Sequence, residues 1–429
     1  MVEAMTTRTR LSVLLVSTPL LAFIVFGGMG KASGGDQTFR HLRVFEDVVS
    51  LILNNYVEDA KIDKVMEGAL RGLADGLDPD SAYLTAAEVK TIEPGEKLPA
   101  GDVGIELTRQ YYLRVIAARD ESPAAKAGLQ TGDYVRAIDG KPARDLSVFE
   151  GMRLLRGAPG SKVTLTVIRG NAAEPRQIEL VREKTPGALV TGKMLAPDLG
   201  YIRIAAFGPD AAAKIRAQAD TLSKSGAKEL VIDIRHTAEG AFETGLDAAR
   251  VFVKSGTLAM IAGRDEQAPK PGATGTTPAS GDVAAPSPGQ TPGLARSTKP
   301  SAAAITQTIT AKPNDGAIAL PVTLLVTTGT SGAAELFAAA LDGNKRAEMI
   351  GERTLGRAGI QKLVRLPEGR GLWLTYARYL TPDGETIQSK GLTPDLGVDE
   401  PDVDFDQPRP AKDPILDAAL ERIAKKKAA

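Results

Sequence analysis

The scarcity of cysteine and histidine limits the chemistry that this chain of 429 residues can perform. Cysteine is absent, which excludes disulfides, thiolate metal sites, iron–sulfur clusters and cysteine nucleophiles. The two histidines, His41 and His236, are too few for a histidine-rich metal cage, so we expect no metal and no cofactor. A Ser-His-Asp triad would have to use one of these two histidines.

The N-terminus and the charge balance indicate where the protein acts. Arg8 and Arg10 precede the uncharged apolar run 11–26, and small residues follow it. This order is typical of a secretory signal peptide or a short membrane anchor, which we assign to residues 1–32. We expect an exported protein, periplasmic or anchored facing the extracytoplasmic side. Lys+Arg and Asp+Glu both count 53, so no net field favours nucleic acid as a partner.

Periodic apolar residues divide the rest of the chain into regions. Helical spacing predicts a helical N-terminal region at 33–98, and short strands with two helix signals predict a small barrel-like module at 99–185. Strands alternate with helices at 186–265 and 318–400, which predicts an α/β domain. Residues 401–429 form a tail in which we expect an amphipathic helix.

The segment 266–317 interrupts the α/β domain. It is rich in Pro, Gly and Ala, and its stretch 267–304 holds no aromatic residue. Such a segment buries too little apolar surface to offset its chain entropy, so we predict a disordered surface insertion.

The central module resembles the bacterial form of the PDZ domain. The resemblance rests on Ser122–Gly140, which reads SPAAKAGLQTGDYVRAIDG. In such domains a loop of backbone N–H groups binds the terminal carboxylate of a peptide, which adds as a strand. The matching positions here are Gly104, Ile105, Glu106 and Leu107. The resemblance implies binding of protein C-terminal tails; a PDZ fold whose groove binds nothing outside the chain is the alternative.

Most of the remaining chain resembles the C-terminal processing peptidases, or tail-specific proteases, of serine peptidase family S41. The motifs stand in the family's order, and in the first of them Asp80 replaces a histidine: Leu77–Ser81 (LDPDS), Gly200–Ile204 (GYIRI), Ala377–Gly384 (ARYLTPDG) and Lys390–Asp395 (KGLTPD). The implied fold is an α/β multidomain protein with a helical N-terminal region, a PDZ domain and an S41-type protease core.

Both residues that carry the family's chemistry are substituted. The family uses a serine nucleophile and a lysine base 25 residues later. The motifs place Gly332 and Arg357 at these positions, with the same separation. Glycine has no side-chain oxygen, so Gly332 cannot be the nucleophile. A guanidinium keeps its proton below about pH 12, so Arg357 cannot be the general base. Gln361 matches the family's helper glutamine, which is idle without a nucleophile.

The loop implied to supply an oxyanion N–H group is also altered. It spans Asp233–Gly240 and has Glu239 where the family has glycine. We expect this side chain to constrain the backbone and to add negative charge near the site of a developing oxyanion.

A relocated nucleophile is the rival interpretation. Ser331 precedes Gly332, and a pair with His236 could perform acyl transfer. Ser331 would otherwise cap the helix that opens at Ala333. Lys345 and Lys362 are further bases in principle, although both are expected in solvent.

We therefore predict an exported S41-like protein, catalytically inactive, that binds protein C-termini through its PDZ domain and has an active protease as a possible partner. The alternatives are an active serine endopeptidase using Ser331 and an oligomeric scaffold subunit.

Overall fold

The computed structural model describes residues 35–92, 99–170, 174–184, 189–263, 304–401, 403–405, 407 and 412–428. The chain forms two units, one of residues 1–69 with 282–302 and the other of residues 70–281 with 303–429. The predicted signal peptide or anchor, residues 1–32, lies outside the described residues. Among the helices described, none is long and apolar enough to cross a membrane.

In the first unit the described residues, 35–69, are mostly helical, as predicted for this region. It contains helix α2 (Gly35–Asn55) and the start of α3 (Ile62–Asp75). Large apolar side chains of α2 are exposed, among them Leu42, Val48 and Leu51.

The helical N-terminal region at 33–98 also contains one strand, which the apolar periodicity did not predict. Strand β1 (Ala82–Leu84) pairs antiparallel with β18 (Gly371–Leu380) and leads into α4 (Ala86–Lys90). A three-residue strand shows no periodicity, and its partner lies almost 300 residues later, so the sequence pattern could not reveal it. Helix α4 begins at a capping box between Thr85 and Glu88, as the predicted turn suggested.

The PDZ domain is an antiparallel sheet with strand order β3-β4-β5-β7-β8. Its helices, α5 (Pro123–Lys126) and α6 (Val148–Leu155), match the two helix signals in the sequence. The main strands are β3 (Ile105–Gln110), β4 (Tyr112–Ala118), β5 (Tyr134–Ile138), β7 (Lys162–Ile168) and β8 (Arg176–Val181). Short elements complete it: β2 (Gly101–Asp102) paired with β9 (Glu183–Lys184), β6 (Lys141–Pro142) beside β5, and a 3₁₀ turn at Ala143–Asp145.

The second domain is built on a mostly parallel sheet with order β10-β11-β12-β15-β16-β19, in which β10 alone runs antiparallel to its neighbour. Its strands are β10 (Val190–Ala196), β11 (Leu199–Ile204), β12 (Glu229–Asp233), β15 (Val322–Val326), β16 (Ala347–Gly351) and β19 (Leu396–Gly397). The predicted α/β pattern is confirmed here.

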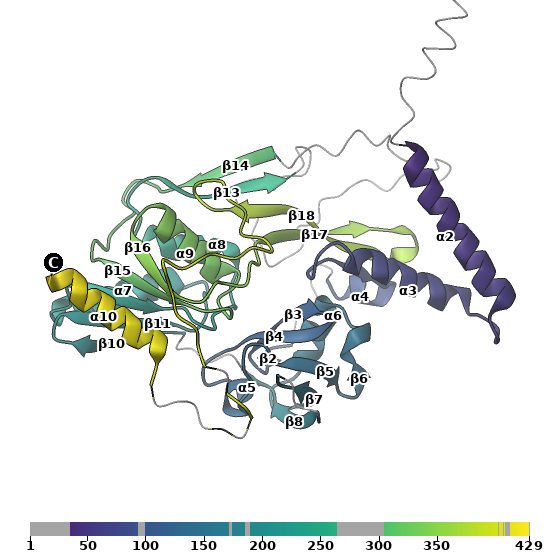
Figure 1. Ribbon diagram of the computed structural model, residues 1–429, viewed down its shortest axis with the longest axis horizontal. Helices are drawn as coiled ribbons and strands as arrows, with labels where there is room; N and C mark the ends of the chain where they lie inside the picture. The colour runs from purple at the N-terminus through teal and green to yellow at the C-terminus, as the bar shows by residue number, and fades with distance from the viewer. Residues whose placement is uncertain are drawn as a thin grey trace, which may run out of the picture. The chain divides into compact units, whose positions relative to one another are not determined.

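Helices cover both faces of this sheet (Figure 1). One face packs against α7 (Ala211–Lys224), α8 (Phe242–Arg250) and α9 (Ala333–Gly343) in the main hydrophobic core. The tail helix α10 (Pro414–Ala428) covers the other face with Ile415, Ala419 and Ile423. The tail is therefore amphipathic, as its sequence predicts.

An antiparallel sheet adjoins the parallel one. One of its strands lies within the range predicted to be a disordered insertion. Its strands are β1, β13 (Thr257–Gly263), β14 (Ala304–Thr310), β18 and β17 (Gly359–Arg365). Strand β14 pairs with β13, so the segment from 304 onward belongs to the fold and the predicted disordered range 266–317 is too long. Alternating Ile and Thr residues mark the strand, but the Pro- and Gly-rich composition before it masked that signal. Residues 264–303 lie outside the described residues.

The parallel sheet determines where the candidate site lies. Strands β12 and β15 are neighbours, and the loops after them hold Asp233–Gly240 and Gly329–Gly332. Because the carboxyl ends of parallel strands meet at one edge of a sheet, these two loops, 90 residues apart, lie together.

Close packing of α8 against the start of α9 supplies a first prediction. A Cβ atom at Gly245 would lie 2.2 Å from the carbonyl oxygen of Ala333, so Gly245→Ala should overpack this contact and lower the free energy of unfolding by about 1–3 kcal/mol. The control is Gly68→Ala, a helical glycine with nothing within 4 Å, which should stabilise by about 0.5–1 kcal/mol. Urea unfolding measures both, and equal effects of the two changes would contradict the packing argument.

Candidate active site

Position 332 has space for a side chain but carries none. Gly332 precedes α9 with φ 63° and ψ −118°, a conformation that favours glycine. A Cβ atom there would lie 3.8 Å from the carbonyl oxygen of Ala238 and 3.9 Å from Phe242, which is ordinary contact distance. The position expected for a nucleophile thus has room for a Cβ atom but carries no reacting group, and its positive φ would strain any residue other than glycine.

The buried carboxylate of Glu335 joins the two substituted positions. Its Oε2 accepts from the backbone N–H groups of Gly332 at 3.1 Å and Arg357 at 2.8 Å. Its Oε1 accepts from Gly356 N–H at 2.7 Å and from the Thr354 hydroxyl. Burial raises the pKa of Glu335, and the four donors oppose that rise. The structure therefore brings Gly332 and Arg357 together around one carboxylate.

Two departures from the family motifs contact each other. The Nε atom of Arg357 lies 3.0 Å from Oδ1 of Asp80, and its NH1 atom lies 3.4 Å from Oε2 of Glu106 in the PDZ domain. The negative charge of Asp80, chiefly, and that of Glu106 raise the pKa of Arg357. Arg357 is consequently a charged ion-pair partner and cannot accept a proton from a nucleophile.

Gln361 points toward the turn that carries Asp80. Its Nε2 donates to Thr375 Oγ1 at 3.1 Å, and that hydroxyl donates to Asp78 Oδ1 at 3.1 Å. Asp78 also accepts from the backbone N–H groups of Asp80 and Ser81. Gln361 thus helps to hold the turn in place.

A cavity of about 270 Å³ adjoins these residues. Asp80, Arg357, Gln361 and Trp373 line it from the protease-like domain, and Glu106 and Phe149 line it from the PDZ domain. Burial raises the pKa of Glu106 to about 7, although Arg357 acts against this rise. The charge of Glu106 therefore changes near neutral pH at the wall of the cavity.

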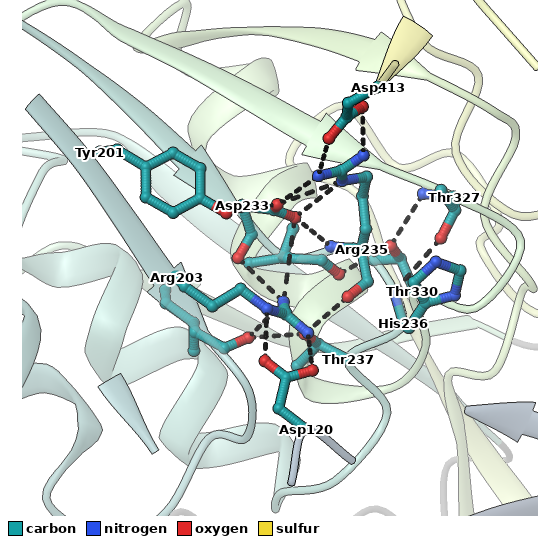
Figure 2. A network of polar contacts seen from close by, with 12 residues as sticks. Asp120, Tyr201, Arg203, Asp233, Arg235, His236, Thr237, Thr327, Thr330 and Asp413 are labelled. Carbon is teal, nitrogen blue, oxygen red and sulfur yellow. Dashed lines mark hydrogen bonds and ion pairs between the residues drawn. The ribbon is translucent and has the colours of Figure 1, made fainter. Parts of the chain in front are cut away.

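Ion pairs hold the loop after β12 rigidly (Figure 2). Asp233 accepts from the Arg235 side chain and from the Tyr201 hydroxyl at 2.7 Å. Arg235 also binds Asp413 through two hydrogen bonds of 2.8 Å. Burial alone would raise the pKa of Asp233, but Arg203 and Arg235 outweigh it and lower the pKa to about 2. Asp233 and Arg235 thus have structural roles in this loop.

The structure does not join Ser331 and His236. The Nε2 atom of His236 lies 2.8 Å from Glu400 Oε2, and Nδ1 lies 2.9 Å from Thr131 Oγ1. Ser331 Oγ is buried and has no hydrogen-bond partner among the described residues. The capping role predicted for Ser331 is also wrong, because Gly332 is the N-cap and no side-chain cap bond forms there.

Glu239 has its partner in the PDZ domain. Its carboxylate pairs with Arg119 of the PDZ domain, which also binds Asp102 at 3.0 Å. The expectation of added negative charge near an oxyanion is replaced by a link between the two domains. A second link joins Arg203 to Asp120 through bonds of 2.8 and 3.0 Å (Figure 2).

The predicted peptide-binding residues occupy the start of β3. Gly104 has φ 72° and precedes the strand, while Ile105 and Leu107 are buried in the PDZ core. Glu106 points toward Arg357 instead. The small pocket beside these residues has a volume of about 20 Å³.

Comparison with known proteins agrees with this geometry. Residues 198–398 match the model of peptidase family S41, and residues 114–169 match a PDZ domain model. The chain therefore contains a peptidase family S41 region together with a PDZ domain. It is similar to a carboxy-terminal-processing protease of Bartonella bacilliformis, with 28% identity over 89% of this chain and 80% of the relative. It is also similar to the carboxy-terminal processing protease CtpA of Bacillus subtilis, with 26% identity over 91% of this chain and 74% of the relative.

The fold agrees with a solved structure of the family. The photosystem II D1 C-terminal processing protease superposes with a TM-score of 0.61 at 27% identity, covering 82% of this chain and 85% of that one. The S41 core with its PDZ domain, expected from the motifs, is therefore confirmed.

Sequence reasoning missed three functional contacts of this S41 chain. The ion pair of Asp80 with Arg357 could have been suspected, because both residues depart from family motifs with opposite charge. Glu335 stands three residues after Gly332, which is typical of a contact at a helix N-terminus, but its donors at 354–357 belong to another loop and had no local signal. The pair of Arg119 with Glu239 had no local signal either, since the two residues are distant in sequence.

The raised pKa of Glu106 supplies a second prediction. The unfolded carboxyl, with a pKa near 4.5, loses its proton first as pH rises, so the wild type should lose stability between pH 4.5 and 7. Relative to Glu106→Gln, the loss should be about 1–3 kcal/mol between pH 5 and 7.5. Urea unfolding at both pH values measures it, with exposed Glu179→Gln as the matched control. A difference between wild type and Glu106→Gln that is constant with pH would contradict the prediction.

Proposed function

We propose that this protein is a catalytically silent member of family S41 that binds protein C-terminal tails through its PDZ domain. The observation that carries the proposal is the state of the two reacting positions. Gly332 offers no oxygen, and Arg357 is held protonated by Asp80 and Glu106. Attack on a peptide carbonyl needs a nucleophile and a proton acceptor, and this pair supplies neither.

The contacts of Ser331 and His236 argue against a relocated nucleophile. Both ring nitrogens of His236 have partners, Thr131 and Glu400, and neither is Ser331. Lys362 lies over the ring of Tyr376, with its Nζ 5.0 Å from the ring centroid. A serine with no adjacent base is a poor nucleophile at neutral pH.

The form of the PDZ sheet supports tail binding. Strand β3 is at the edge of the sheet, paired with β4 on one side. A peptide can add along such an edge while its carboxylate meets the N–H groups of the preceding loop. Helix α6 lies beside β3 and lines the neighbouring pockets with Met152 and Arg156.

Two further parts of the proposal rest on separate features. Export, to the periplasm or to an anchored position outside the cytoplasm, stays a prediction from residues 1–32. A role as an oligomeric scaffold subunit is the second candidate, and the exposed apolar residues of α2 favour it.

The absence of a working dyad predicts an inactive protein. Purified residues 33–429 should neither degrade casein nor react with a fluorophosphonate probe, and Gly332→Ser alone should restore no turnover because Arg357 keeps its proton. Gel-based proteolysis and probe labelling measure both properties. Turnover that Ser331→Ala abolishes would support the relocated nucleophile and overturn the silent assignment.

Tail binding predicts dependence on a free carboxylate. A decapeptide with an apolar C-terminal residue should bind with micromolar affinity, on the order of −6 to −8 kcal/mol. Amidating its C-terminus removes a charge-assisted hydrogen bond worth roughly 1.5–3 kcal/mol and should weaken binding at least tenfold. Fluorescence anisotropy with both peptides tests this, and equal affinities would show that the groove does not recognise carboxylates.

A further inference from the structure

The guanidinium of Arg119 lies against the PDZ loop expected to bind carboxylates. Its side chain is 4% exposed, and its backbone N–H donates to the carbonyl of Gly104 at 2.8 Å. A Cβ atom at Gly104 would lie 3.2 Å from the NH2 atom of Arg119. The loop therefore has a buried cation beside it, which is the group that attracts a peptide's terminal carboxylate.

Two carboxylates of this chain already neutralise Arg119. Asp102, which precedes the loop, binds its NH2 atom at 3.0 Å and also accepts from Gly104 N–H at 2.8 Å. Glu239, from the loop after β12, binds its NH1 atom. Burial works against the charge of Arg119, but the two carboxylates outweigh it and raise the pKa of this side chain.

Glu239 shares one pocket with the PDZ loop. Gly104, Ile105 and Glu106 line it from the PDZ domain, with Ala238 and Glu239 opposite them. Its free volume of about 20 Å³ suffices for about one water molecule and not for the last residue of a peptide. A C-terminal residue can therefore enter only if the Glu239 segment leaves.

We infer that the carboxylate of Glu239 is a built-in ligand of the PDZ carboxylate site, and that a protein tail binds by displacing it from Arg119. The inference rests on the proposed tail binding and adds its regulation. The exchange is balanced in charge, because one carboxylate replaces another beside the same guanidinium. The binding free energy of a tail is reduced by the free energy of releasing Glu239.

Displacement of Glu239 would also affect the surroundings of position 332, because the residues next to Glu239 lie beside that position. The Glu239 carbonyl accepts from Phe207 N–H at 2.9 Å, and Gly240 follows with φ 139°. The carbonyl of Ala238, one residue earlier, lies 3.8 Å from where a side chain at 332 would begin. Release of Glu239 therefore loosens the wall of the site as a tail binds.

The test compares peptide affinity in full-length variants. Glu239→Gln keeps the shape of the side chain and removes its charge, while Glu239→Gly removes the competing group altogether. Each should bind a fluorescein-labelled free-acid decapeptide ending in Leu-Ala-Ala at least fivefold more tightly than the wild type. Glu179→Gln is the matched control, because Glu179 is an exposed residue of the same domain paired with Lys162 at 2.7 Å.

Hydrogen exchange gives a second readout that does not depend on a substitution. Saturating the wild type with the same peptide should speed exchange of the amides in 236–241, since the segment loses its anchor. No change of exchange in this segment would overturn the inference.

The outcomes separate the inference from the function on which it rests. Tighter binding by both Glu239 variants, with no change in Glu179→Gln, supports it. Measurable binding that is equal in the wild type and both variants overturns the inference and leaves tail binding intact. An equal gain in Glu179→Gln overturns it as a general charge effect. No binding by any protein at millimolar peptide overturns tail binding and the inference together.

Discussion

The candidate site depends on one buried carboxylate. Glu335 accepts hydrogen bonds from the loop that opens α9 and from the loop before β17, so the two substituted positions stay adjacent although 25 residues separate them. A buried carboxylate is costly unless its oxygens are satisfied, and four donors satisfy this one. This constraint on the backbone is independent of which side chains occupy positions 332 and 357. The scaffold of an S41 site therefore persists here without the reacting groups.

The substitutions at the site form a consistent electrostatic set. Replacing an expected lysine by Arg357 places a permanent charge beside the cavity, and Asp80 compensates it within 3.0 Å. Glu106 extends the pair to the PDZ domain. A neutral general base requires a desolvated amine without carboxylate partners, whereas Arg357 is a guanidinium with two carboxylate partners. Contacts with Asp80 and Glu106, which belong to two other segments, thus keep Arg357 protonated.

Charged residues also couple the two domains at the loop after β12. Asp233, Arg203 and Arg235 hold the loop from within, and Arg203 reaches Asp120 across the domain boundary. The pair of Glu239 with Arg119 differs from these contacts because it lies in the pocket lined by Gly104 and Glu106. The loop after β12 therefore lies beside position 332 and beside the PDZ residues expected to bind a peptide, which connects the two parts of the proposal.

The sequence by itself indicated the S41 resemblance, the α/β and PDZ architecture and the presence of Gly332 and Arg357 at the expected dyad positions, because motifs and their spacing are local patterns with direct chemical meaning. Periodicity likewise predicted α10 and the strand β15. Tertiary structure alone decided which charges meet, since the pairs of Arg357 with Asp80 and of Arg119 with Glu239 join segments more than 100 residues apart. It also gave the ring nitrogens of His236 the partners Thr131 and Glu400 in place of Ser331, and it placed β14 in a sheet. Contacts between distant segments depend on packing geometry, which no short stretch of sequence encodes.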